Sequence, residues 1–280
     1  MKKASIATAE HPFIRILLIV LAVTFVGIFV MLPLAVVFAE ALSKGLGTYS
    51  HALMDENARS AIKLTLLVAV IAVPCNMIFG LAASWAITKF DFVGKRILIT
   101  FIDLPFSVSP VISGLIYVLL FGTHSLLSGW LERNDIQIIF AVPGLVIATI
   151  FVTFPFVARE LIPLMEEQGT EAEEAAVMLG ANGWQTFWYV TLPNIKWGLF
   201  YGVLLCNARA MGEFGAVSVV SGHISGLTNT IPLHVEILYN EYNFAAAFAV
   251  ASILTLLALF TLLLKSIIEY YFPHEIKALH

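Results

Sequence analysis

The sequence predicts an all-α integral membrane protein with six transmembrane helices, and three observations support that prediction. Of the 280 residues, 60% are hydrophobic and only 12% are charged, a composition typical of membrane-spanning chains. The apolar residues form stretches that can cross a hydrocarbon core of about 30 Å, which needs about 20 helical residues. Backbone groups find no water in lipid, so these stretches must be helical.

Six stretches satisfy the length requirement. We expect transmembrane helices at residues 13–39, 61–87, 97–121, 138–157, 197–220 and 244–264. The first stretch follows two lysines and precedes Ala39-Glu40-Ala41, as a signal peptide would. It is nevertheless much longer than the roughly 7–15 apolar residues of a signal peptide. We therefore interpret it as an uncleaved span that packs at the periphery of the others.

The positions of Lys and Arg indicate the orientation. With the N-terminus inside, ten of the fifteen Lys and Arg residues flank the inner ends of the spans and four flank the outer ends, while Arg209 lies within a span. Cytoplasmic flanks carry an excess of these residues. We therefore expect cytoplasmic N- and C-termini and a cytoplasmic polar segment 160–196. The outer segment 222–243 has no Lys or Arg, and we expect a solvated loop that faces an outer partner.

The segment 160–196 is the longest polar interruption of the chain, and its residues predict two short helices. Gly180 favours the left-handed conformation just beyond a helix end, and Pro193 is expected to end the second helix. Two residue pairs have the spacing of a capping box, which starts a helix: Thr170 with Glu173, and Asn182 with Gln185.

A seven-position pattern in this segment resembles the EAA loop of ABC-importer permeases. Its seven positions are Glu174-Ala175-Ala176, Gly180, Val190 and Leu192-Pro193, and Phe187 lies between them. Val190 stands where isoleucine is commoner in that family, and the remaining spacing is kept. The resemblance implies a coupling helix that docks into a groove on a cytoplasmic ATPase. The coupling residues would be Glu174, Ala175, Ala176, Gly180, Phe187, Leu192 and Pro193.

The alternative for the polar segment is an amphipathic hairpin lying on the lipid surface. Five glutamates lie between residues 166 and 174, with no Lys or Arg among them. Anionic lipid repels such a segment, whereas a partner protein need not. The charge pattern therefore favours a protein partner.

Longer stretches extend the resemblance along almost the whole chain. IDLPFSVSPVISGLIYVLLFG at 102–122 and NARAMGEFGAVSVVSG at 207–222 are similar to W-type permease subunits of bacterial sulfate/thiosulfate ABC importers. The resemblance implies a type I importer permease fold in the bacterial inner membrane. It divides the chain into a first helix and outer loop at 1–60, a permease domain at 61–267 with its coupling loop at 160–196, and a tail at 268–280.

The same resemblance implies the partners of the chain. These are a second permease of T type, two copies of a cytoplasmic ATPase that uses ATP and Mg²⁺, and an outer sulfate/thiosulfate-binding protein. The chain itself carries no nucleotide-binding motif or catalytic motif, so we expect no bound cofactor and no enzyme activity. Its net charge of −4 gives no indication of nucleic acid binding, and its other contact is membrane lipid.

Polar residues inside two spans are candidates for a translocation path or gate. The third span contains Asp103, Pro105 and Ser107, and its prolines predict a broken helix. We leave open whether this break is a gate or a kink that serves packing. Arg209 and Glu213 are four residues apart and share a helix face. An internal ion pair is favoured for Glu213, whereas Arg209 fits an ion pair and a contact with the translocated anion equally well.

Small residues recur along the fifth span, which predicts close approach of a neighbouring helix. They form the row Gly198, Gly202, Cys206 and Ala210.

Three other functions were weighed against a sulfate permease. A molybdate permease shares the coupling loop and differs in its anion. A secondary transporter needs intramembrane carboxylates, which Asp103 and Glu213 supply, but leaves the coupling loop unexplained. An intramembrane enzyme needs a nucleophile–base pair or metal ligands, and no metal-site spacing occurs.

Overall fold

The computed structural model describes residues 12–123 and 125–271, and its regular elements there are all helical. Two of these elements, η2 and η3, are π-helical. The elements are α1 (Pro12–Val26), η2 (Gly27–Met31), α2 (Leu32–Leu42), α3 (Gly45–Met54), α4 (Glu56–Lys89), α5 (Lys95–Ser107), α6 (Pro110–Phe121), α7 (Ser128–Arg133), α8 (Val142–Thr153), α9 (Pro155–Gln168), α10 (Glu171–Met178), α11 (Gly183–Thr186), η3 (Phe187–Thr191), α12 (Leu192–Met211), α13 (Gly215–Ser221), α14 (Ile231–Asn240) and α15 (Phe244–Tyr271).

The candidate spans number four to six in this part of the chain. Four helical stretches are long and apolar enough to cross a membrane: Phe13–Leu42, Glu56–Lys89, Val142–Gln168 and Phe244–Ile267. Two bent pairs qualify if each pair is one span. The axes of α5 and α6 differ by 108° at the break between them. The helical stretch Gly183–Met211 and the following α13 differ by 49°.

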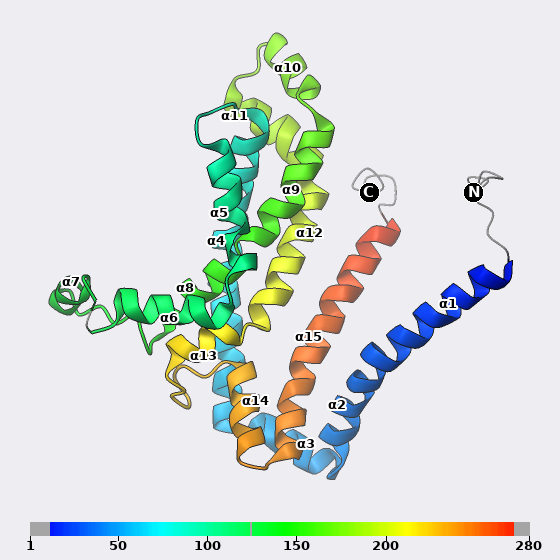
Figure 1. Ribbon diagram of the computed structural model, residues 1–280, viewed down its shortest axis with the longest axis vertical. Helices are drawn as coiled ribbons and strands as arrows, with labels where there is room; N and C mark the ends of the chain where they lie inside the picture. Colours follow the sequence, from blue (N-terminus) through cyan, green and yellow to red (C-terminus); the bar gives the residue numbers. More distant parts are fainter. Residues whose placement is uncertain (1–11, 124, 272–280) are drawn as a thin grey trace.

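Figure 1 shows how these helices are arranged. The helices α4, α9 and α12 run together along the long axis, with α10 and α11 at one end and α3 and α14 at the other. Helix α6 runs across this axis after the break. The first span lies away from the bundle, and its most apolar window has no buried residue, so its predicted peripheral position is confirmed.

Helix α4 is the central element and runs unbroken for 34 residues. Its start is fixed by Asp55, whose carboxylate accepts hydrogen bonds from the backbone N–H groups of Asn57 and Ala58 at 3.0 and 3.3 Å. Such an N-cap satisfies amides that have no partner within the helix. Helix α4 packs against α8, α9, α12 and α14, so it contacts both ends of the molecule.

The bundle is tightest around Val157 of α9. A Cβ added at Gly80 of α4 would lie 2.6 Å from the Val157 Cβ, and one added at Gly202 of α12 would lie 3.1 Å from its Cα. Small residues permit such close approach between membrane helices. The predicted row of small residues is buried, as expected: Gly198, Gly202, Cys206 and Ala210.

A buried polar cluster joins α4, the end of α8 and α12. The Asn76 amide nitrogen donates to the Thr153 hydroxyl at 2.7 Å, and the Cys206 thiol donates to the Thr153 carbonyl at 3.6 Å. All three side chains are fully buried. Hydrogen bonds between membrane helices typically contribute about 0.6 kcal/mol each, so this cluster fixes the register of the helices more than their stability.

The fourth span is longer than the sequence analysis predicted. It ends at Gln168 instead of residue 157, because the polar sequence beyond Val157 keeps an apolar stripe. Leu161, Leu164 and Met165 are buried, at the three- and four-residue spacing of a helix face. The first residues of the polar segment therefore belong to α9, and the helix ends only at Gln168, before Gly169.

Two π-helical turns each precede a Leu-Pro pair, Leu32-Pro33 and Leu192-Pro193. A proline inside a helix lacks an N–H group, and its ring clashes with the carbonyl four residues earlier. The wider π turn accommodates the ring, and the Leu192 N–H donates to the carbonyl of Phe187, five residues back. The prediction that Pro193 ends a helix is therefore wrong, since Gly183–Met211 is one continuous rod.

The outer segment is more ordered than the expected solvated loop. Helix α14 packs on α4 and α15 and buries Ile231, Leu233 and His234. Burial lowers the pKa of His234, while the carboxylates of Asp55 and Glu241 act in the opposite direction. The expectation of a solvated loop was wrong here because the absence of Lys and Arg does not determine whether a segment is helical.

Candidate functional site

The first candidate region is the polar hairpin, which we define as residues 169–191 between α9 and α12. Gly180 forms its corner with a φ of +93°, a conformation that L-residues with a side chain rarely adopt. The predicted capping box after the corner is confirmed. The Gln185 N–H donates to the Asn182 carboxamide and the Asn182 N–H donates to the Gln185 side chain, both at 2.9 Å.

The capping box predicted at Thr170 is absent, and this expectation is corrected. Thr170 has a φ of −117° and a ψ of −1°, whereas an N-cap that bonds its own helix usually has extended backbone. Its hydroxyl donates instead to the Glu174 carboxylate at 2.6 Å. Glu173 turns away from Thr170 because it is engaged by a cation on another helix.

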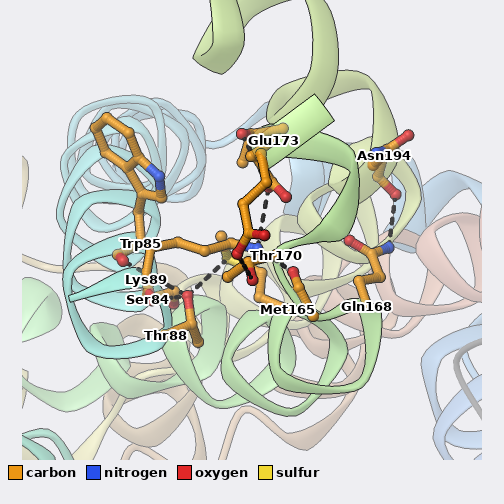
Figure 2. Close-up of polar contacts among 12 residues, drawn as sticks. Ser84, Trp85, Thr88, Lys89, Met165, Gln168, Thr170, Glu173 and Asn194 are labelled. Atoms are coloured by element: carbon orange, nitrogen blue, oxygen red, sulfur yellow. Dashed lines mark hydrogen bonds and ion pairs between the residues drawn. The ribbon is translucent and has the colours of Figure 1, made fainter. Parts of the chain in front are cut away.

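That cation is Lys89, the last residue of α4. Its ammonium group lies 3.0 Å from the Glu173 carboxylate and donates a short hydrogen bond to the Gly169 carbonyl. The same Glu173 oxygen accepts a hydrogen bond from the Thr191 hydroxyl at 3.2 Å. Figure 2 shows Lys89 and Glu173 meeting between their helices, with Gln168 bonded to the Asn194 carbonyl nearby.

The motif residues fall into two groups in the structure. Phe187 is buried and packs on Trp85 of α4, with ring centroids 4.9 Å apart. Leu192 packs against the core of α4, α9 and α12, and Pro193 lies in the first turn of α12. These three anchor the hairpin. Glu174 and Ala175 are exposed and Ala176 is half-buried, so these residues and Gly180 form the outer corner.

An exposed apolar surface surrounds this corner. Leu179 and Met178 are 91% and 88% exposed, although both are large apolar residues. Exposed apolar patches on a soluble surface mark sites of interaction. This surface was not predicted from the sequence; the position of Met178 and Leu179 directly before Gly180 was the available signal. The surface comprises Val177, Met178, Leu179, Trp184, Trp188 and Tyr189.

The second candidate region is the broken-span junction, where α6 begins beside α13. A Cβ added at Gly114 of α6 would lie 2.7 Å from the Ala216 carbonyl oxygen, and one at Gly215 would lie 3.0 Å from the Pro110 Cβ. The third span breaks at Val108 and Ser109, not at Pro105, which is buried inside α5. The residue before a proline disfavours helical backbone, and Ser109 precedes Pro110.

Arg209 and Glu213 form an ion pair at this junction. An Arg209 guanidinium nitrogen lies 2.6 Å from a Glu213 carboxylate oxygen. The other carboxylate oxygen accepts a hydrogen bond from the Ala216 N–H at 2.9 Å. Glu213 is only 2% exposed and lies in the break between α12 and α13. It therefore both neutralises Arg209 and caps the first turn of α13.

Four of the five predicted path residues come together here, since Glu213 pairs with Arg209, and Asp103 does not. Arg209, Pro105 and Ser107 line one cavity of about 280 Å³. Asp103 pairs instead with Arg159, at 3.0 Å from its Nε, and both side chains are about half exposed. The Arg159 guanidinium also lies 4.6 Å from the centre of the Phe106 ring. Asp103 thus ties α5 to α9 one turn away from the cavity.

The two broken spans and the helical hairpin define a class of protein, a multi-spanning membrane permease. The chain belongs to the family of binding-protein-dependent transport system inner membrane components, whose pattern matches residues 76–271. It is therefore a multi-pass inner membrane protein and a permease subunit of an ABC transport complex.

Individual proteins are similar over most of the chain. The sulfate transport system permease protein CysW of Synechocystis is 53% identical over 94% of this chain and 95% of its own length. The related CysT of Escherichia coli is 36% identical, with 87% of each chain covered.

A solved structure supports the fold. The alginate ABC transporter in complex with its alginate-bound periplasmic protein matches with a TM-score of 0.74, covering 92% of this chain and 94% of that chain at 16% identity. The all-helical ABC permease fold is thereby confirmed.

Proposed function

We propose that this chain is one permease subunit of an ATP-driven importer of sulfate and thiosulfate. The observation that carries the proposal is the 53% identity over 94% of the chain to a protein named as a sulfate permease. Thiosulfate is included because it is a tetrahedral dianion like sulfate. Molybdate has the same charge and shape, so it enters the test below as a competitor.

In this proposal the chain pairs with a second permease of T type. The similarity to CysT as well as to CysW supports two related subunits that face each other across one pathway. An outer binding protein delivers the anion, as the family description implies. All six candidate spans cross the membrane, with both termini cytoplasmic. That arrangement places the polar hairpin inside and α3 and α14 outside.

The polar hairpin is the coupling element in this proposal. Its apolar surface around Leu179 and Met178 is exposed, and so are Glu174 and Ala175 beside it. This shared exposure supports the proposal that the surface docks on a partner. Two cytoplasmic ATPase subunits bind ATP and Mg²⁺, and one of them receives this face in a groove. Closure of the ATPases moves the hairpin, and with it the helices that it joins.

The broken-span junction borders the translocation path in this proposal. Arg209 supplies the positive charge nearest to the cavity that it lines with Pro105 and Ser107. Because Glu213 already neutralises Arg209 at 2.6 Å, a passing dianion meets a weak contact and is not trapped. Asp103 lies at the margin of the path and holds the inner half of the broken span to α9.

Sulfate uptake in cells lacking this gene tests the proposal, with wild type or Gly180→Arg supplied in trans. Nothing within the chain lies within 4 Å of a Cβ added at Gly180, so the variant should fold and insert. The strained φ and the new side chain at the docking face should abolish uptake. A control for the added arginine alone is Gly47→Arg, since Gly47 has open space around it, has no left-handed φ and lies at the other end, in α3.

Three results support the assignment together. Wild type restores uptake, unlabelled thiosulfate competes, and Gly180→Arg is inserted but inactive while Gly47→Arg is active. Stronger competition by molybdate would move the substrate to that anion. Normal uptake by Gly180→Arg would remove the coupling role from the hairpin.

A further inference from the structure

Lys89 is placed unusually for a lysine at the end of a membrane span. Its side chain is only 9% exposed, and that of its partner Glu173 is 19% exposed. Lys95, at the start of the next helix, pairs with Asp91 at 3.6 Å, but these side chains are 32% and fully exposed. Exposed pairs contribute little, whereas loss of one partner from a buried pair is costly. Lys89 therefore belongs to the interior contacts of the protein.

The contacts of Lys89 join α4 directly to the end of α9 and to α10, and through Glu173 to η3. Lys89 lies at the C-terminal end of α4, where a cation interacts favourably with the helix dipole. It bonds the carbonyl of Gly169, where α9 ends, and Glu173 of α10. Through Glu173 it reaches Thr191 of η3. The hairpin touches α4 elsewhere through an aromatic contact, Phe187 on Trp85, so Lys89 supplies the directional link.

The opposite end of α4 is bonded to the outer segment by hydrogen bonds of two neutral hydroxyl side chains. The Ser60 hydroxyl donates to the Gly226 carbonyl at 2.7 Å. The Thr65 hydroxyl accepts from the N–H of Ile231, the first residue of α14, at 2.9 Å. A helix of 34 residues spans about 51 Å at 1.5 Å per residue. One continuous helix, with Pro74 in its interior, is thus bonded to the polar hairpin at one end and to the outer segment at the other.

We propose that Lys89 is a positioning residue that transmits movement of the polar hairpin to α4 and through it to the outer segment. This inference rests on the proposed function, because it names the residue through which that hairpin acts. The physical basis is that a charged hydrogen bond resists displacement in a fixed direction, whereas the Trp85–Phe187 contact allows the rings to slide. Without Lys89 the hairpin remains attached but moves independently of α4.

The test uses the complete complex of both permeases and the ATPase in liposomes, with sulfate-loaded binding protein outside. The readouts are the stimulation of ATP hydrolysis by the binding protein, sulfate uptake, and the amount of ATPase that copurifies. The variants are Lys89→Met, which keeps the length of the side chain, Glu173→Gln, and the double variant. Lys95→Met is the matched control, and Lys89→Arg tests whether the charge suffices.

Lys89→Met should lower stimulation and uptake by about two- to thirtyfold, the range of coupling effects from single substitutions, while the ATPase copurifies in full. Glu173→Gln should lower them less, since its carboxamide still accepts hydrogen bonds. The double variant should be no worse than Lys89→Met, because the two residues act as one pair. Lys95→Met should match wild type, and Lys89→Arg should recover most of the stimulation.

Wild-type stimulation of ATP hydrolysis by the binding protein in the Lys89→Met complex would overturn the inference. So would a double variant whose loss of stimulation equals the product of the two single losses. Loss of the ATPase from the Lys89→Met complex would show that the residue only folds the hairpin, which also overturns it. If Lys89→Met fails to insert, Glu173→Gln decides by the same readouts. Failure of the wild-type complex to take up sulfate counts against the proposed function instead, because no variant is involved.

Discussion

The polar hairpin and the broken-span junction keep their shapes through different kinds of contact. The hairpin is held by side-chain hydrogen bonds and one ion pair, such as Asn182 with Gln185 and Lys89 with Glu173. The junction contains the Arg209–Glu213 ion pair, but its closest helix contact depends on the lack of side chains at Gly114 and Gly215. Water reaches the exposed Asn182–Gln185 box of the hairpin, whereas Gly114 of the junction is buried between helices.

This difference predicts how each region responds to change. Removing one hydrogen bond from the exposed part of the hairpin leaves its other contacts in place, so each such loss of stability is modest. Adding atoms where two helix backbones touch costs more stability, because close-packed interiors relax only partly. The following predictions test this contrast, beginning with the junction.

The largest effect on stability is expected at Gly114. An added Cβ would lie 2.7 Å from the Ala216 carbonyl oxygen and 2.9 Å from the Val219 Cβ. Gly114→Leu should push α6 away from α13, cost about 3 kcal/mol, the upper part of the usual overpacking range, and lower the melting temperature of the purified complex. Gly129→Leu in α7, where the surroundings are open, is the control. An unchanged melting temperature would contradict the close approach.

A smaller effect is expected from Glu213→Gln. The substitution leaves Arg209 without its counter-charge, while the Ala216 N–H keeps an acceptor. Breaking a fully buried pair costs about 3–5 kcal/mol, but the Arg209 side chain is 35% exposed, so solvent reduces the cost to about 2 kcal/mol. The melting temperature measures it, with Asp91→Asn in the exposed Lys95–Asp91 pair as control. Equal effects in both variants would show that burial does not distinguish these pairs.

The smallest effect is expected from Asn182→Ala in the hairpin. It removes the N-cap hydrogen bond to the Gln185 N–H and should cost about 1 kcal/mol. Sulfate uptake should fall less than in Gly180→Arg, and the protein should insert normally. Asn194→Ala is the control, because the contact of Asn194 with Gln168 uses its backbone carbonyl. A loss of stability as large as in Gly114→Leu would remove the contrast between the regions.

Several features of both regions were predictable from adjacent residues. The Gly180 corner and the Asn182–Gln185 box depend on residues within one turn of each other, and both were predicted. The pairing of Arg209 with Glu213 followed from a separation of four. The Thr170 box failed for the converse reason, because a distant lysine engages Glu173 more strongly than the local backbone does.

Pro193 shows a second limit of local reasoning. A proline predicts a helix end, but the chain continues through a π turn because α12 is held by burial of Ile195, Gly198 and Gly202 against its neighbours. Tertiary packing thus outweighs the local preference. The exposed Leu179 and Met178 were missed for a similar reason, since helix propensity says nothing about which face remains uncovered.

The membrane class, the approximate spans, the corner of the hairpin and the family resemblance could be predicted from the amino-acid sequence alone. These follow from composition, from the length of apolar runs and from spacings within about twenty residues. Only the tertiary structure decided that Lys89 meets Glu173, that Val157 lies between Gly80 and Gly202, and that α6 crosses to α13. Such contacts depend on how distant helices pack, and many sequences with the same local pattern would pack differently.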